Sequence, residues 1–317
     1  MPKAHPPLGN TEFSLVHFTL RMREKTLLTP QMLLGMRNGL KKAARRLDAE
    51  TDQGRLELID PAIPFDPWSS QVRKKPAPPF AFIPPGLVSR ELGPEEPMAL
   101  AFCFWGRGIQ QLPLFAGILR ELGRQGLEKG VARFDLTGID AEDATGSSTV
   151  IWREKEDFEA MAPPIIPVEW WLENLSLSGP RLTLRFHTPA RLISQNKPLF
   201  QPGFAEIFPF MLRRVTSILK HYCDFGQEVD GRHLVELAAE LTPVRHSLSW
   251  QDWKNVGGQG PGAVGGVVGD LEVEGAGLRE LLWIIALGSL LNIGKGAAFG
   301  AGNYTLEAPA AVGALPR

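Results

Sequence analysis

Cysteine is scarce in this sequence. Cys103 and Cys223 are the only cysteines among 317 residues, and both lie in apolar surroundings. Disulfide frameworks and thiolate metal sites need several cysteines at short, regular spacings. The sequence therefore excludes a small disulfide-stapled domain, and it predicts a reduced, cytoplasmic protein with no metal site built on cysteine.

Long apolar runs are also missing. A membrane-spanning helix needs about 20 consecutive apolar residues, and no such run occurs. The first seven residues, MPKAHPP, lack the apolar core of a signal peptide. Apolar residues make up 44% of the chain and charged residues 22%, which is a globular composition. We expect no membrane partner, and the length suffices for two ordinary domains.

The chain has no overall excess of one charge, because its net charge is −1. The distribution is uneven, however. Residues 21–46 contain eight basic residues and one acidic residue, whereas residues 140–159 contain seven acidic and two basic residues. The first of these segments could attract a polyanion while the second keeps the whole chain near neutrality. For any single charge, an ordinary solvated helix face remains the simpler interpretation.

The first half of the chain alternates strand-like and helix-like patterns. Helices are predicted from Thr29-Pro30 to Leu47 and over residues 112–125, because apolar residues recur there at spacings of three and four. Residues 61–97 contain ten prolines and are predicted to be a long irregular connection. The predicted strands cover residues 13–21, 98–105, 131–136 and 149–153.

The second half repeats this kind of order. Its predicted helices cover residues 204–222 and 278–291, and its predicted strands cover residues 181–187, 264–273 and 303–306. A middle block between the first helix and the second strand covers residues 234–241 and 244–250. Both halves approximate β-α-β-β-α-β, the ferredoxin-like arrangement. The predicted fold class is therefore α+β, with two tandem ferredoxin-like domains at residues 1–160 and 168–317. A proline-rich linker, residues 162–167, is expected to join them.

Three basic residues of the first predicted helix share one face. Arg37, Lys41 and Arg45 are spaced at i, i+4 and i+8, so their side chains project in the same direction. The apolar stripe of the helix lies elsewhere, so this face is expected to be exposed. A basic face of this kind can attract a polyanion.

The segment from Gly288 to Leu306 is the most informative part of the chain. Glycine permits positive φ and close backbone approach, and successive main-chain N–H groups in such a loop can bind an anion. A lysine inside the loop adds a charge suited to phosphate. A tight helix-to-strand crossover that needs glycine only for packing is an about equally good interpretation. The residues concerned are Lys295 and the glycines Gly288, Gly294, Gly296, Gly300 and Gly302.

Two common nucleotide-binding loops do not fit this segment. A Walker A loop needs four residues between its glycines and Ser or Thr after the lysine, whereas five residues separate Gly288 from Gly294 and Gly296 follows Lys295. A dinucleotide-binding loop needs G-x-G-x-x-G between a strand and a helix. Here the third glycine is one residue late and the predicted elements come in the reverse order.

The pattern I-G-K-G-x-x-F-G-x-G over residues 293–302, before a closing strand, resembles the glycine-rich signature of the CRISPR-associated RAMP superfamily. It is most similar to that of the endoribonucleases that process CRISPR repeat transcripts. Weaker similarities bring the matched region to most of residues 80–310. The segments that carry them are residues 102–106, 112–122, 126–136, 182–192, 208–215 and 265–270.

The resemblance implies two tandem RRM-like domains that bind the repeat RNA of the precursor transcript and cut it to give guide RNAs. It implies attack by a ribose 2′-hydroxyl that leaves a 2′,3′-cyclic phosphate, without metal or cofactor. Members often carry a cysteine cluster in the N-terminal half, and this chain has none, so no zinc is expected. The glycine-rich segment with Lys295, the basic face of the first helix, and Arg185 are then expected to bind RNA.

The proton-transfer groups are harder to assign. Many relatives have a histidine on or beside the first helix, but residues 30–47 contain none. Histidine suits proton transfer near neutral pH, and His17 on the first predicted strand is the leading candidate. His187, at the end of a strand in the second half, is the second candidate. No Ser/His/Asp order or paired-carboxylate motif stands out.

Two further possibilities stay open. Trp68, Trp250 and Trp253 lie in polar or glycine-rich surroundings and could stack on unpaired bases, although core packing is the usual role of tryptophan. The absent helix histidine favours a second function, a RAMP subunit that holds guide RNA among CRISPR effector-complex proteins without cutting it. A small-molecule phosphate enzyme is a more distant alternative, and the oligomeric state is left open.

Overall fold

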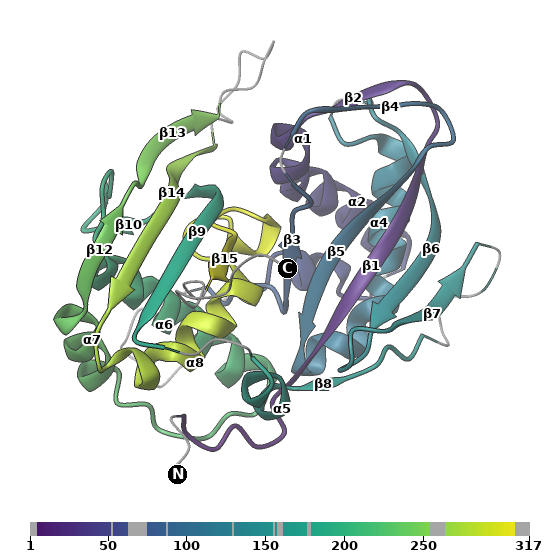
Figure 1. Ribbon diagram of the computed structural model, residues 1–317. Coiled ribbons are helices and arrows are strands. Elements are labelled where there is room, and N and C mark those ends of the chain that lie inside the picture. Colours follow the sequence, from purple (N-terminus) through teal and green to yellow (C-terminus); the bar gives the residue numbers. More distant parts are fainter. Residues whose placement is uncertain are drawn as a thin grey trace, which may run out of the picture.

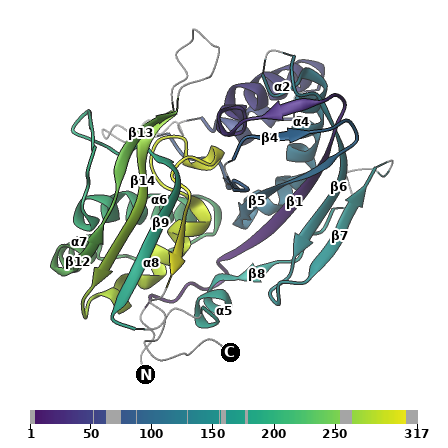
Figure 2. The same cartoon turned by 45° about the horizontal axis from the view of Figure 1, so that its top comes forward.

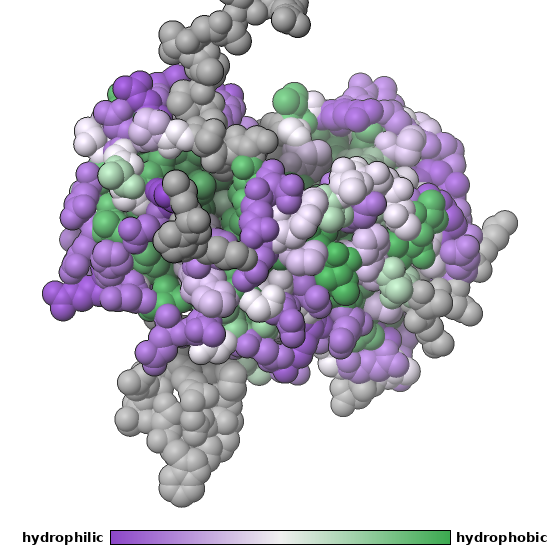
Figure 3. Space-filling view, turned by 60° about the horizontal axis from the view of Figure 1, so that its bottom comes forward, coloured by the Kyte–Doolittle hydropathy of each residue, from purple (hydrophilic) through white to green (hydrophobic). Residues whose placement is uncertain are grey.

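The computed structural model describes residues 5–51, 53–62, 75–86, 88–128, 130–154, 156, 161–175, 179–253 and 264–307. Its two large antiparallel sheets, each with helices on one face, lie side by side (Figure 1). None of the helices in these ranges is long and apolar enough to cross a membrane. On the face shown in Figure 3, hydrophilic residues predominate and hydrophobic residues appear in several separate patches.

The first sheet has the strand order β3-β5-β1-β6-β7, and β8 also pairs with β1. The chain passes through β1, α2, β3, β5, α4 and β6 in that order, so this sheet has the ferredoxin-like topology. The helices pack on the face formed by alternate residues of β1, such as Val16 and Phe18. The bounds are β1 Glu12–Met22, α2 Met36–Glu50, β3 Phe80–Ile83, β5 Pro97–Trp105, α4 Leu112–Gln125, β6 Phe134–Glu142, β7 Ser148–Arg153 and β8 Ile166–Pro167.

The proline-rich connection was predicted to be irregular, and this is wrong for part of it. β3 lies within it and forms the edge of the first sheet, while β4 (Arg90–Leu92) pairs with β2 (Thr26–Leu28). Phe80 and Phe82 of β3 are fully buried, so core packing compensates for the short length. Prolines flank β3 rather than interrupt it, which an edge strand tolerates.

The first predicted helix is divided in two by Gly35. The Thr29 hydroxyl caps α1 (Pro30–Leu34) by accepting from the N–H of Met32 at 3.3 Å, as Thr29-Pro30 predicted. α2 then begins at Met36. The apolar stripe is buried at Leu33, Met36, Leu40, Ala43 and Ala44, so the basic residues of α2 lie away from that stripe.

The second sheet has the strand order β12-β14-β9-β15, and β13 pairs with β14. The order of elements β9, α6, β12, β14, α8 and β15 repeats the ferredoxin-like topology, which confirms the predicted fold class (Figure 2). Periodicity had predicted the bounds of α6 and α8 correctly. The bounds are α5 Val168–Glu173, β9 Arg181–Ala190, β10 Ile193–Ser194, β11 Lys197–Pro198, α6 Phe204–Tyr222, α7 Gly231–Glu240, β12 Thr242–His246, β13 Ser249–Trp253, β14 Val264–Glu274, α8 Leu278–Leu291 and β15 Tyr304–Glu307.

The cores of the two halves interlock. Phe13, Cys103 and Trp105 of the first sheet belong to the hydrophobic cluster of the second half. In return, Ala298 and Phe299 from the C-terminal loop belong to the cluster of the first half. The loop that carried the glycine signature is therefore built into the junction between the two sheets.

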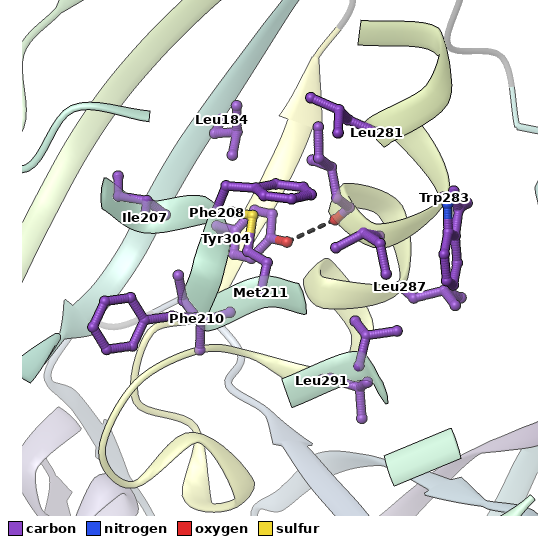
Figure 4. Packing of buried hydrophobic residues seen from close by; sticks show 14 of the residues in the cluster. Leu184, Ile207, Phe208, Phe210, Met211, Leu281, Trp283, Leu287, Leu291 and Tyr304 are labelled. Atoms are coloured by element: carbon purple, nitrogen blue, oxygen red, sulfur yellow. Dashed lines mark hydrogen bonds between the residues drawn. The ribbon is translucent and has the colours of Figure 1, made fainter. Parts of the chain in front are cut away.

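Close helix-to-strand packing places β15 against α8. The side chain of Tyr304 is buried and its hydroxyl donates to the backbone oxygen of Ile285 at 2.6 Å (Figure 4). A Cβ at Gly288 would lie 2.2 Å from that hydroxyl. Gly288 is thus a packing glycine, as the alternative interpretation held.

Candidate nucleic-acid interface at the domain junction

The glycine-rich loop comprises residues 292–303, between α8 and β15. Its glycines at 294, 296, 300 and 302 have φ values of 86°, 90°, 92° and 67°. Residues that carry a side chain rarely adopt such positive φ values, so the backbone path requires glycine at these positions. A short 3₁₀ turn, Ala297–Phe299, lies between Gly296 and Gly300. The loop therefore has one defined shape rather than the open structure of a flexible linker.

Three of these glycines also lie against other atoms. A Cβ at Gly302 would be 2.0 Å from the oxygen of Ile293, and a Cβ at Gly300 would be 2.7 Å from the ring of Phe82. At Gly294 it would be 2.7 Å from the oxygen of Arg191. At Gly296, in contrast, the nearest atom would be 3.4 Å away. Packing explains the first three positions, whereas only the backbone conformation requires glycine at 296.

Most N–H groups of the loop are used inside the protein. Within the described part of the chain, the N–H groups of Asn292, Gly294, Gly296 and Ala298 donate to no partner, and those of Gly294 and Gly296 lie directly on either side of Lys295. The main-chain donors that the sequence predicted for anion binding are thus reduced to the two N–H groups that flank Lys295. The N–H groups that donate internally are those of residues 293, 295, 297, 299, 300, 301, 302 and 303.

Lys295 is exposed, and its ammonium group has no ion pair or hydrogen bond among the described residues. Its own N–H donates to the oxygen of Arg191 at 3.0 Å, which fixes the backbone from which the side chain extends. The loop therefore presents an uncompensated positive charge beside two free main-chain donors. Such an arrangement can bind a phosphate group.

Helix α2 brings Arg37 against Phe299 of the loop. Its guanidinium carbon lies 5.5 Å from the centre of the Phe299 ring, a cation–π contact. One nitrogen is 3.3 Å from Asp60, and Nε is buried without a partner. The side chain is 43% exposed. Arg37 is thus held by the loop and keeps hydrogen-bond donors available for an anion.

The same Asp60 binds two lysines. Its second oxygen lies 2.6 Å from Lys41 Nζ, and its first lies 2.7 Å from Lys75 Nζ. Burial opposes ionisation of Asp60, but hydrogen bonds and charges from the two lysines outweigh it and lower the pKa of its carboxyl group. Lys41 is therefore engaged in an ion pair. Arg45, the third residue of the predicted basic face, is exposed without an ion pair in the described ranges.

His187 lies on the uncovered face of the second sheet, beside the loop. Its N–H donates to the oxygen of Asn303 at 2.9 Å, and its ring Nε2 lies 2.8 Å from the hydroxyl of Thr305. The next residue, Thr188, donates its hydroxyl to the oxygen of Gly300 at 2.7 Å. The ring of His187 is exposed. Of the two predicted catalytic histidines, His187 is the one that these contacts connect to the loop.

Arg185, two residues earlier on β9, is surrounded by carboxylates. Its guanidinium group lies 3.0 Å from Asp270 and 3.0 Å from Glu307. Asp270 also binds Arg245 at 2.8 Å. The charge of Arg185 is therefore offset, which weakens the case for a role in RNA binding.

His17 lies on the uncovered face of the first sheet, among acidic residues. Its Nε2 is 2.7 Å from the carboxylate of Glu142, and it faces Asp140 across the β1–β6 pairing. Asp140 in turn binds Arg153 at 2.7 Å. No described hydrogen bond or ion pair links His17 to the glycine-rich loop. These carboxylates repel a phosphate, so the surroundings of His17 disfavour the role predicted for it.

A buried polar network that no sequence pattern predicted holds the loop in place. Asn292, Asn303 and Thr188 are all buried and joined by hydrogen bonds. No local pattern predicts this network, because Thr188 and its partner Gly300 are 112 residues apart in the sequence.

The predicted base-stacking tryptophans receive little support. All of Trp68 and the side chain of Trp253 lie outside the described residues. Trp250 is half-buried, with its ring 4.8 Å from that of Phe200 and its indole N–H donating to Asp252. Trp250 is therefore engaged in packing, which is the usual role of tryptophan.

The described side chains offer no group of three or more His, Cys, Asp or Glu residues placed to hold a metal ion. Both cysteines are buried, and burial raises the pKa of the Cys223 thiol to about 12. Neither thiol is therefore available as a reactive thiolate near neutral pH.

Comparison with protein families gives two matches along the chain. Residues 184–304 match the model described as CRISPR-associated endoribonuclease Cas6. Residues 60–164 match a model described as the N-terminal domain AF_1859_N. The first match contains most of β9 and all of α6, α8 and the glycine-rich loop. No curated protein matches the chain.

Solved structures match nearly the whole chain. A product complex of Cas6 (TTHB231) has a TM-score of 0.55 and 16% identity, and the match covers 94% of this chain and 100% of that one. Thermus thermophilus Cas6 (TTHB231) has a TM-score of 0.52 with the same identity and coverage. A partial Cas6-RT-Cas1–Cas2 complex has a TM-score of 0.57 and 10% identity, covering 94% of this chain and 46% of that one. With TM-scores above 0.5 and identities of 16% or less, these matches show a shared fold alone.

Proposed function

Since this chain belongs, through residues 184–304, to the family of CRISPR-associated endoribonuclease Cas6, as its glycine-rich segment predicted, we propose that it binds CRISPR repeat RNA and cleaves the precursor transcript into guide RNAs. One observation carries the proposal. The family signature folds into a rigid loop at the domain junction, which presents Lys295 without a counter-ion and holds Arg37 beside it.

The loop supplies contacts suited to an RNA backbone. The Lys295 ammonium group and the free N–H groups of Gly294 and Gly296 can bind one phosphate, and Arg37 can bind a second oxygen or a neighbouring phosphate. Arg45 extends the positive surface along α2. Lys41 contributes mainly through the net positive charge of its cluster, because its ammonium group is held by Asp60.

The cleavage step needs a nucleophile, two proton transfers and charge stabilisation. The 2′-oxygen forms a bond to the adjacent phosphorus while the bond from phosphorus to the 5′-oxygen breaks. The 2′-proton goes to a base, and the 5′-oxygen receives a proton, leaving a 2′,3′-cyclic phosphate and a 5′-hydroxyl. Arg37 and Lys295 would stabilise the negative charge on the phosphate oxygens in the transition state. These roles require no metal ion.

His187 is the better of the two predicted candidates for proton transfer. Its ring is exposed and lies on the strand that holds Gly300 in place. It would exchange its contact with Thr305 for one with the RNA. His17 is bound to Glu142 and faces Asp140 across the sheet, so its surroundings are negatively charged.

A non-catalytic role is the second candidate. The chain has no histidine between residues 30 and 47, and the second-sheet face around His187 also carries Asp270 and Glu307. With the same phosphate contacts, the protein would hold guide RNA among CRISPR effector-complex proteins. This alternative retains the RNA site and removes only the chemistry.

The deciding experiment incubates the purified protein with the repeat RNA encoded beside its gene, in EDTA, and maps both product ends. We expect a single cut with a 2′,3′-cyclic phosphate and a 5′-hydroxyl. RNA carrying 2′-deoxyribose before the cut is expected to bind normally and stay intact, because only the nucleophile is removed. Tight binding without cleavage of the natural RNA would establish the second candidate. Cleavage only after addition of a divalent metal would refute the proposed mechanism.

A further inference from the structure

Asn292 has an unusual backbone conformation directly after α8. Its φ is 56° and its ψ is 170°, and its side chain is fully buried. This region of backbone space is essentially restricted to glycine. A glycine here would remove the strain, so the asparagine side chain must contribute something that compensates for it.

The side chain amide of Asn292 uses all of its polar atoms. Its Nδ2 donates to the oxygen of Phe82 at 2.8 Å and to the oxygen of Ala297 at 2.9 Å. Its Oδ1 accepts from Nδ2 of Asn303 at 3.0 Å. A buried amide with two donors and one acceptor satisfied is a strong and specific connection.

These three bonds join separate parts of the molecule. Phe82 lies on β3, the edge strand of the first sheet, whereas Ala297 lies at the centre of the glycine-rich loop and Asn303 at its end. The N–H of Asn303 donates to the Thr188 hydroxyl at 2.7 Å, and that hydroxyl donates to Gly300. The network therefore fixes both ends and the middle of the loop on both sheets.

We propose that Asn292 is a positioning residue for the RNA site. It locks the glycine-rich loop onto the first sheet, so that Lys295 on the loop and Arg37 on α2 face the same stretch of RNA backbone in a fixed relation. That the ligand is RNA rests on the proposed function. The attachment of the loop to the first sheet through Asn292 does not depend on any ligand.

Two substitutions distinguish the effect of the backbone conformation at residue 292 from the effect of the side-chain hydrogen bonds. Asn292→Gly keeps the backbone conformation without strain and removes all three hydrogen bonds. Asn292→Asp keeps the shape and the acceptor, but its ionised form places a carboxylate against the oxygens of Phe82 and Ala297. Burial and these two acceptors raise the pKa of such a carboxyl group. Its protonated form can donate one of the two lost bonds.

The experiment measures hydrogen exchange at the loop amides, repeat-RNA affinity and cleavage rate for wild type and both variants. For Asn292→Asp at pH 8, we expect faster exchange at the N–H groups of Ile293 and Gly302, at least a tenfold loss of affinity, and partial recovery of both at pH 5.5. The wild type is expected to show no such recovery. Asn292→Gly is expected to show the exchange and affinity defects at both pH values. Asn174→Asp, on the exposed end of α5, is the matched control.

The outcomes distinguish this inference from the proposed function. Wild-type exchange and affinity in both folded variants would overturn the positioning role. If both variants fail to fold, Thr188→Val tests the same network, because it removes only the hydroxyl that links Asn303 and Gly300. Unchanged exchange at Gly302 in that variant would refute the inference. If exchange changes as expected but the wild-type protein does not bind RNA, the locking stands and the proposed function fails.

Discussion

Basic residues are concentrated on α2, yet several of them are paired with carboxylates, whereas the single lysine of the glycine-rich loop is not. On α2, Lys41 is paired with Asp60, Arg37 contacts the same carboxylate, and Arg46 lies 3.2 Å from the buried Glu121. Lys295 has no such partner in the described part of the chain. A basic run in a sequence therefore measures charge but not its availability, because distant carboxylates can neutralise it.

The uncovered faces of the two sheets extend this comparison. Arg185 on the second sheet and His17 on the first sheet are each bound to carboxylates. The glycine-rich loop between the sheets is held by backbone and amide hydrogen bonds instead. We therefore expect a polyanion to follow the junction and α2 rather than the centre of either face.

The largest expected difference is between the two histidines. His187→Ala should slow cleavage by roughly 10²–10⁴-fold if it transfers a proton, whereas His17→Ala should leave the rate within a few fold. Single-turnover cleavage at saturating protein measures the chemical step separately from binding. Equal loss in both variants would contradict the ranking, and normal cleavage in both would assign the proton steps to other groups.

Two glycines with nearly the same backbone test the junction. Gly300→Val and Gly296→Val introduce the same side chain at φ values of 92° and 90°, but only the former meets Phe82. Both should be strained, by roughly 1–3 kcal/mol, and the Gly300 variant should lose further stability through overpacking, by roughly 1–3 kcal/mol. Denaturant unfolding measures the difference. Equal losses of unfolding free energy in the two variants would mean that the contact between Gly300 and Phe82 adds no packing constraint.

The two kinds of lysine can be compared through salt dependence. Lys295→Ala should weaken RNA binding and reduce the salt slope by about 0.7–0.9, the value for one phosphate contact. Lys41→Gln should change the slope less, because its ammonium group is bound to Asp60. Affinities over a range of salt concentrations provide the measurement. Replacing Arg37, Lys41 and Arg45 together by Gln should lower affinity steeply, and an unchanged affinity would place that face away from the RNA.

The smallest expected effect concerns Asp60. Its pKa is lowered in the folded protein, so its ionised form stabilises the fold above the unfolded value of about 3.9, and this contribution is lost as pH falls below it. Asp60→Asn should reduce the free energy of unfolding by roughly 1–2 kcal/mol at pH 7. The difference from wild type should shrink toward pH 3. A constant difference across this range would mean that the charge of Asp60 is not what stabilises the cluster.

The sequence alone determined the features that depend on near neighbours. The helices α4, α6 and α8 follow from spacings of three and four, because an α-helix brings those residues onto one face. The glycine-rich loop was found because its positive φ values require glycine at those positions. The family signature lies in this same local segment, so the fold class and the family could both be predicted.

Tertiary structure decided which side chains are free to act. β3 could not be predicted within its proline-rich segment, because its burial depends on strands and helices elsewhere in the chain. His17 meets Glu142 across 125 residues, and Asn292 meets Phe82 across 210. Spacing and periodicity report only residues within a few positions of each other, whereas ion pairing and buried networks depend on how the sheets pack. The candidate loop could therefore be predicted from the sequence, but the relative importance of the basic residues and of His17 and His187 could not.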